Sequence, residues 1–194
     1  MREETLDFNT LKEFVSEGFE IGNHTLTHPD LRNCSEQAIT REIEEMNDLL
    51  LSYGVQRPKT FCYPGYHTDN RVASTIKSLG FSHARTGYIY TDMSWTAWES
   101  NERPSTPRPP TSYYPNDSES RWLTKSTGVL NHAYRFGDFV KDVEDMPDGL
   151  CGVFVFHGLV EERLISDFKK IVEFISENDS LTTINFRDLP ANAQ

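Results

Sequence analysis

The apolar residues of the chain alternate between helical stripes and short runs. From residue 36 to 53 they recur every three or four positions, after Ser35 and before Gly54, which predicts a capped amphipathic helix. The same reasoning predicts further helices at 10–18, 69–80, 136–143 and 164–175. Runs rich in apolar and β-branched residues between the helices predict strands at 19–24, 60–63, 81–86, 150–156 and 181–186.

This alternation favours an α/β fold in which helices cover a parallel sheet, either open or closed into a barrel. Residues 88–130 interrupt the pattern. They include the stretch RPSTPRPPTSYYPNDSES, which predicts a long surface loop. We expect the 194 residues to form a single domain.

Three chemically suggestive features follow predicted strands. His24 and His28 stand four residues apart before a proline, in a segment poorly suited to helix, and Tyr63-Pro64-Gly65-Tyr66 follows the next strand. His157 ends a later apolar run. Ligands bind at the carboxyl ends of parallel strands, so we expect these features on one rim, with the histidine pair as metal ligands and His157 as a general acid.

Composition narrows the classes of partner. Hydrophobic residues make up 37% of the chain and aromatic residues 12%, as in globular proteins. The formal net charge of −11 argues against nucleic acid and anionic membranes as partners. The sequence shows neither a secretion signal nor an apolar run long enough to span a bilayer, and its localisation and oligomeric state stay open. The three cysteines are odd in number and widely spaced, which favours free thiols.

Three stretches, in order, resemble the polysaccharide deacetylase family, the NodB-homology fold of carbohydrate esterase family four. GFEIGNHTLTHPDL resembles its His-x-x-x-His motif. FCYPGYHTDNRV, followed by LGFSHART, resembles its proline-containing loop motif. GVFVFHGL resembles its last motif, an apolar strand that ends in a catalytic histidine.

The resemblance implies a parallel-stranded, distorted (β/α) barrel that removes N- or O-acetyl groups from an acetylated carbohydrate with a divalent metal, usually zinc. Carried over by position, His24 and His28 would bind the metal and His157 would protonate the leaving group. The backbone N–H of Gly65, in the loop with Tyr63, Pro64 and Tyr66, would face the oxyanion. Val155 would shape the acetyl pocket.

The chain departs from the family pattern at its start. The family's Thr-Phe-Asp-Asp motif, which supplies the catalytic base and third metal ligand, should precede the first helix, where Asp7 is the nearest carboxylate. We therefore expect a NodB-like domain that is N-terminally incomplete and lacks its first strand or two. Cys62 also stands where many members carry an arginine that orients the base.

Three interpretations stay open at this point. The chain is part of an ordinary deacetylase, or a catalytically impaired relative that only binds carbohydrate, or an unrelated scaffold with structural histidines. Catalytic zinc normally has three protein ligands, so we expect two histidines alone to bind zinc weakly and to give little deacetylation.

Overall fold

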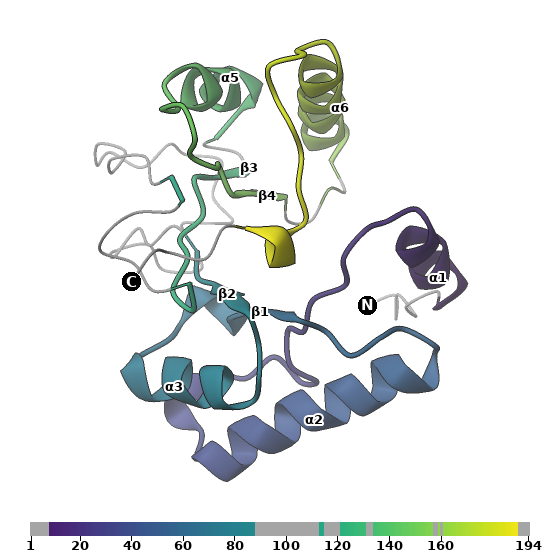
Figure 1. Cartoon of the computed structure of the whole chain (residues 1–194), viewed down its shortest axis with the longest axis vertical. Helices are drawn as coiled ribbons and strands as arrows, with labels where there is room; N and C mark the ends of the chain where they lie inside the picture. The colour runs from purple at the N-terminus through teal and green to yellow at the C-terminus, as the bar shows by residue number, and fades with distance from the viewer. Residues whose placement is uncertain are drawn as a thin grey trace. The chain divides into compact units, whose positions relative to one another are not determined.

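The computed structural model describes residues 8–87, 113–114, 121–130, 134–156, 159 and 161–189. Two compact units are distinguished, and each is described by itself (Figure 1). Among the described residues, unit 1 comprises 8–86, 121–123 and 184–189, and unit 2 comprises most of the rest between 87 and 183.

Unit 1 is built on two short parallel strands. Strand β1 (Thr60–Cys62) pairs with β2 (His83–Arg85), with Phe61 opposite Ala84. On the other edge of β1, Asn23 forms an isolated parallel bridge with Phe61. The strand expected at 19–24 is thus reduced to one bridging residue, and β1 has a partner on both sides.

The helices of unit 1 confirm the sequence prediction closely. They are α1 (Phe8–Ser16), α2 (Glu36–Ser52) and α3 (Asn70–Ser78). The Ser35 hydroxyl accepts a hydrogen bond from the Ala38 N–H (3.2 Å), and the Asp69 carboxylate accepts one from the Val72 N–H (2.8 Å). These side chains satisfy backbone donors that a helix start leaves without partners.

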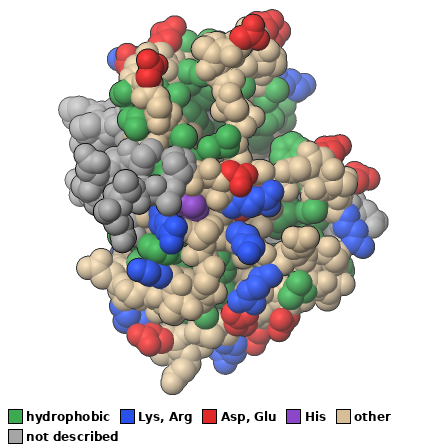
Figure 2. Space-filling model, viewed as in Figure 1, with side chains coloured by type: hydrophobic (Ala, Val, Ile, Leu, Met, Phe, Trp, Pro, Cys, Tyr) green, Lys and Arg blue, Asp and Glu red, His purple; other side chains and the backbone are tan. Residues whose placement is uncertain are grey.

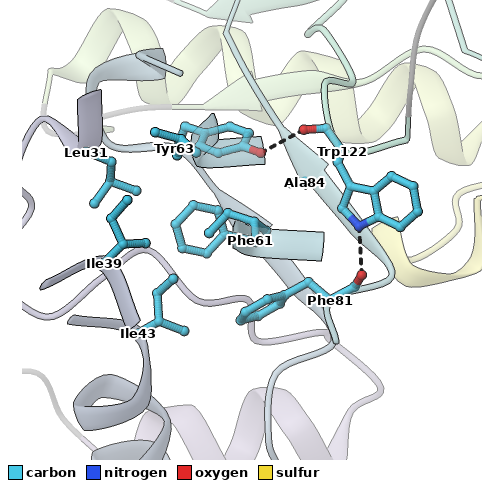
Figure 3. Packing of buried hydrophobic residues seen from close by; sticks show 10 residues of the cluster. Leu31, Ile39, Ile43, Phe61, Tyr63, Phe81, Ala84 and Trp122 are labelled. Atoms are coloured by element: carbon cyan, nitrogen blue, oxygen red, sulfur yellow. Dashed lines mark hydrogen bonds between the residues drawn. The ribbon is translucent and has the colours of Figure 1, made fainter. Parts of the chain in front are cut away.

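The core of unit 1 lies between helices α2 and α3 and the two strands (Figure 3). Helix α2 contributes Ile39 and Ile43, and β1 contributes Phe61, all of them buried. Trp122 closes the far side, where its Nε1–H donates to the Phe81 carbonyl and its own carbonyl accepts from the Tyr63 hydroxyl, both at 2.8 Å. Residues remote in sequence therefore hold the strands in place.

The strand predicted at 181–186 is wrong. Residues 181–185 are irregular and lead into a 3-10 helix, η3 (Phe186–Asp188). Side-chain hydrogen bonds replace strand pairing here: the Asn185 amide donates to the Gly18 carbonyl (3.3 Å), and the Glu20 carboxylate accepts from the Arg187 N–H (2.9 Å). Such local bonds are an alternative to a sheet ladder that hydrophobic pattern alone does not reveal.

Unit 2 has its own parallel pair and core. Strand β3 (Gly128–Leu130) pairs with β4 (Phe154–Phe156), and Val129 lies opposite Val155. Helices α5 (Phe136–Glu144) and α6 (Glu162–Ser176) contact each other (Figure 1). Both helices confirm the prediction. Strand β3 occupies the last positions of the segment expected as a loop, and most of that segment lies outside the described residues.

The visible surface is of mixed charge. The face of unit 1 seen in Figure 2 carries both acidic and basic side chains, so the net charge of −11 is not spread there as a uniform acidic surface. Among the helices in the described part of the chain, none combines the length and apolar character needed to cross a bilayer.

Candidate functional site

His24 and His28 lie in an irregular loop at the carboxyl end of β1. Because Asn23 pairs with Phe61, His24 comes level with Cys62 at the end of the strand. Both imidazoles are exposed, and their ring centroids are 4.8 Å apart with an interplanar angle of 80°. The segment is not helical, as its sequence predicted, and it brings the two rings together.

A backbone contact fixes the tautomer of His24. Its Nδ1 lies 2.8 Å from the Cys62 carbonyl oxygen. A carbonyl can only accept, so Nδ1 carries the proton and Nε2 of the neutral ring keeps its lone pair. A backbone carbonyl that holds the other ring nitrogen in this way is typical of metal-binding histidines.

Asn23 anchors the start of the histidine loop. Its side chain is fully buried, and its amide donates to the Ile43 carbonyl (3.1 Å) and to Asn47 Oδ1 (2.8 Å), both on α2. Its Oδ1 accepts from the Thr25 N–H (2.8 Å). With two backbone bonds to β1, Asn23 ties the loop to both the strand and the helix.

Glu42 holds the middle of the same loop from α2. Its carboxylate accepts from the backbone N–H of Leu26 (3.1 Å) and from the N–H and hydroxyl of Thr27 (2.8 Å each). Burial tends to raise the pKa of Glu42, but these hydrogen bonds outweigh it and leave the pKa below its ordinary value. The carboxylate is therefore ionised at neutral pH.

The loop keeps an uncommon backbone conformation. Thr25 and His28 have φ angles of 66° and 59°, in the left-handed region that non-glycine residues rarely adopt. The Thr25 hydroxyl accepts from the His28 N–H (3.1 Å), which offsets part of the cost. Strain of this kind persists where surrounding bonds impose it, and it clusters at functional sites.

The Pro64 loop leaves β1 at the same end as the histidine pair. Tyr63 is fully buried, and its side chain belongs to the core. Pro64, Gly65 and Tyr66 form the 3-10 helix η2 (Pro64–Tyr66), with φ angles of 57° at Gly65 and 62° at Tyr66. A Cβ on Gly65 would come within 3.2 Å of Nδ1 of His67, so the turn fits glycine there.

Arg85, at the end of β2, lies beside this loop. The strand register places it opposite Cys62, and its Nη2 donates to the Cys62 sulfur at 2.7 Å. Its guanidinium carbon is 5.4 Å from the ring centroid of Tyr66. Burial raises the pKa of the Cys62 thiol, although Arg85 acts in the opposite direction, so the sulfur faces the guanidinium as a neutral thiol.

The donor chemistry here fits part of a zinc site. Two imidazoles on one loop, one with its tautomer fixed, provide nitrogen ligands that zinc accepts. Within the described ranges, no group of three or more histidine, cysteine, aspartate or glutamate side chains is placed to hold a metal ion.

The two remaining predicted site residues belong to the later part of the chain. Val155 is buried in β4 of unit 2, opposite Val129. His157 lies outside the described residues. Their predicted roles therefore stay predictions.

The sequence reading missed three residues that support the site. Asn23 and Arg85 stand in stretches quoted for their motifs, but nothing in their immediate sequence signals a buried network or an approach to Cys62. Glu42 lies on the outward side of the apolar stripe of α2, where a solvated carboxylate is the ordinary expectation. The only hint in the sequence was that Glu42 lies one helical turn from a position expected to be buried.

The family model described as polysaccharide deacetylase matches residues 7–84. A chitooligosaccharide deacetylase of Rhizobium leguminosarum bv. trifolii is 45% identical over 42 residues, which are 22% of this chain and 20% of that protein. A peptidoglycan-N-acetylglucosamine deacetylase of Bacillus cereus is 31% identical over 71 residues, or 37% of this chain and 33% of the relative.

The match to these two relatives thus covers a fifth and a third of their lengths. Among solved structures, a family 4 carbohydrate esterase from Streptomyces lividans in complex with acetate is similar with a TM-score of 0.52 and 15% identity. The similarity covers 88% of this chain and 67% of that chain. At this identity the likeness concerns the fold, an α/β arrangement with parallel strands.

Proposed function

Since the chain belongs to the polysaccharide deacetylase family, we propose that it forms part of a metal-dependent hydrolase that removes N- or O-acetyl groups from a carbohydrate. The observation that carries this proposal is the histidine pair: two rings 4.8 Å apart at the end of a parallel strand, one with its Nδ1–H held by the Cys62 carbonyl. The acetylated carbohydrates named for the two curated relatives suggest the substrate class.

We propose that both units belong to one NodB-like domain spanning 1–194, with strands of a distorted (β/α) barrel. Parallel pairing in each unit and the fold likeness to the Streptomyces lividans esterase support this proposal.

In the proposed site, His24 and His28 hold a divalent metal, most simply zinc. When bound, such an ion polarises an acetyl carbonyl and lowers the pKa of water. The Cys62 carbonyl keeps Nε2 of His24 as the ligating nitrogen, and Asn23 and Glu42 hold the loop in position. These contacts orient the ligands before any ion binds, which reduces the ordering cost of binding.

The other assignments concern the acyl group and the leaving group. The backbone N–H of Gly65, in the Pro64 loop, donates to the developing oxyanion. His157 gives a proton to the departing amine or alcohol, and Val155 shapes the acetyl pocket. In the Pro64 loop, the side chain of Tyr66 is half-buried. The side chain of Tyr63 is buried in the core, so Tyr63 contributes to the site through its backbone.

The experiment is a zinc titration of the chain against a competing chelator dye, with acetate release measured from an acetylated chito-oligosaccharide and an acetylated xylan. His24→Gln and His28→Gln should each weaken zinc binding about tenfold or more, since each removes one ligand. His67→Gln, which changes an exposed histidine of the same unit, should bind zinc like the parent chain.

Zinc binding that is unchanged in both histidine variants would remove the basis of the metal site. Little acetate release is expected from this chain alone under either function, so carbohydrate binding is the readout that separates them. Oligosaccharide binding that calorimetry finds unchanged when zinc is removed by a chelator would favour the second function, carbohydrate binding without turnover.

A further inference from the structure

His67 connects the two loops that carry the proposed site. Its Nδ1 lies 3.4 Å from Oδ2 of Asp30, which stands two positions after His28. The same imidazole also lies against Gly65: a Cβ built on Gly65 would be 3.2 Å from Nδ1 of His67, 3.5 Å from Cε1 and 3.8 Å from Cγ. The ring therefore fills the space in which another residue at position 65 would carry its side chain.

The Asp30 end of this contact is held by bonds of its own. Asp30 caps η1 (Leu31–Asn33), where its carboxylate accepts from the Arg32 N–H (3.1 Å), and it pairs with the Arg32 guanidinium (2.6 Å). Arg71, in the first turn of α3, donates to the carbonyls of Leu31 (3.3 Å) and Arg32 (3.1 Å). Because none of these bonds involves His67, Asp30 keeps its place without the imidazole and can orient it.

The Gly65 end needs support, because its backbone lies in an uncommon region. Gly65 and Tyr66 have φ angles of 57° and 62°, and glycine has more conformational freedom to lose than any other residue. The N–H groups of Tyr66 and His67 donate to the carbonyls of Tyr63 (3.0 Å) and Pro64 (3.1 Å), which closes the turn around Gly65. The imidazole adds a side-chain restraint to the one residue of the turn that has no side chain.

We propose that His67 is a positioning residue: oriented by Asp30, its ring holds the backbone of Gly65 and so fixes the direction of the Gly65 N–H. This inference rests on the proposed role of that N–H as an oxyanion donor. A preorganised donor stabilises a developing charge well because it needs no reorganisation during the reaction. In this assignment His67 contacts neither the metal nor the acyl group, so its loss should affect Gly65 and leave the zinc ligands in place.

The experiment measures the backbone order of Gly65 by nitrogen-15 relaxation, without metal or substrate. We expect an order parameter of about 0.85 in the parent chain, the value of a rigid backbone, and a fall toward about 0.6 in His67→Ala. His67→Gln should stay near the parent value, because the glutamine amide can donate to Asp30 in place of Nδ1. Asp30→Asn should give an intermediate value, since asparagine caps η1 as well as aspartate does but has no charge to attract the imidazole.

Arg57→Met is the matched control, because it breaks another ion pair of unit 1, that of Arg57 with Glu44 (2.6 Å), and should leave the order of Gly65 unchanged. Urea denaturation accompanies each variant. Exposed ion pairs contribute little to stability, so the midpoint of His67→Ala should stay at the parent value. A role in stability alone would instead lower the midpoint and loosen the amides of α3 together with Gly65.

A loss of order in His67→Ala that is confined to the Pro64 loop and is reversed in His67→Gln supports the proposal. The proposal is overturned if Gly65 keeps its order in His67→Ala, if Arg57→Met has the same effect, or if the loss extends through α3 with a lower urea midpoint. In the zinc titration, His67→Ala should bind zinc like the parent chain, and a loss of about tenfold, as expected for a removed ligand, would also overturn the positioning role. Because order is measured without zinc, these outcomes are distinguishable from a failure of the proposed metal site.

Discussion

The carboxylate of Glu42 accepts hydrogen bonds from both the backbone N–H and the side-chain hydroxyl of Thr27, each at 2.8 Å. The two residues are fifteen positions apart in sequence. Thr27 directly precedes His28, so α2 controls the backbone that carries the second histidine. The ends of the loop are held elsewhere, by Asn23 on one side and by the 3-10 helix η1 (Leu31–Asn33) on the other.

Removing the Glu42 carboxylate should loosen the histidine loop. Glu42→Ala leaves three donors to be satisfied by water, and we expect the free energy of unfolding to fall by about 1–2 kcal/mol. Urea denaturation measures the change. Glu45→Ala, an exposed position on the same helix, serves as the control and should change stability by less than about 0.5 kcal/mol. Equal effects of the two substitutions would contradict the role of Glu42.

The contribution of Glu42 should depend on pH. Its pKa in the folded chain lies below the ordinary value of 4.5, so the stabilisation is complete above that value and is lost as the pH falls through the folded pKa. We expect the stability difference between the parent chain and Glu42→Gln to be constant from about pH 7 to 5 and to shrink below 4.5. A difference that stays constant down to pH 3 would show that the charge has no such role.

Asn23 should be among the most sensitive polar residues of unit 1. Asn23→Ala leaves Asn47 and the Thr25 N–H without their partners in a buried setting, and we expect a loss of about 2–4 kcal/mol in unfolding free energy. Asn33→Ala, at an exposed position, is the matched control. In the proposed zinc titration, Asn23→Ala should also weaken binding, because the start of the histidine loop loses its anchor.

Replacing Gly65 or Gly137 by alanine should change the stability of the chain in opposite directions. Gly65 has a φ of 57° and a near contact with His67, so Gly65→Ala should destabilise the chain by about 1 kcal/mol or more. Gly137 lies in α5 with nothing within 4 Å of a built Cβ, so Gly137→Ala should stabilise by about 0.5–1 kcal/mol. Thermal unfolding of the two variants compares them directly, and stabilisation by Gly65→Ala would contradict the strained turn.

The local elements could be predicted from the sequence because their signals are local. Ser35 and Asp69 mark the starts of α2 and α3, and Gly54 and Gly80 mark their ends, through short-range geometry, and the structure confirms both helices almost residue for residue. The prediction of a strand at 181–186 failed because the interactions that decide this segment are not local. Its β-branched residues satisfied the pattern, but Asn185 and Glu20 form hydrogen bonds across 167 positions of sequence that favour a 3-10 helix.

The candidate site was predictable only in its chemically distinctive residues. The spacing of His24 and His28 is visible directly in the sequence. The proline after His28 predicted a turn, and such a turn brings the two rings together. The contacts of Asn23, Glu42 and Arg85 were not visible, because a buried amide, a helix-surface carboxylate and a strand arginine have common structural uses. Only the register of the strands and the position of α2 place Asn23 and Glu42 against the histidine loop and Arg85 beside the Pro64 loop.

The pairing of Asn23 with β1 also determines which substitutions would alter the geometry of the site. Asn23 donates to the Thr60 carbonyl and accepts from the Cys62 N–H, so it spans the residue that points into the core, Phe61. A slip of one position would turn Phe61 toward solvent, and the core therefore forbids it. The same two bonds fix how far the histidine loop stands from the Pro64 loop. Substitutions that preserve a large apolar side chain at position 61 should thus preserve the spacing between the histidine loop and the Pro64 loop.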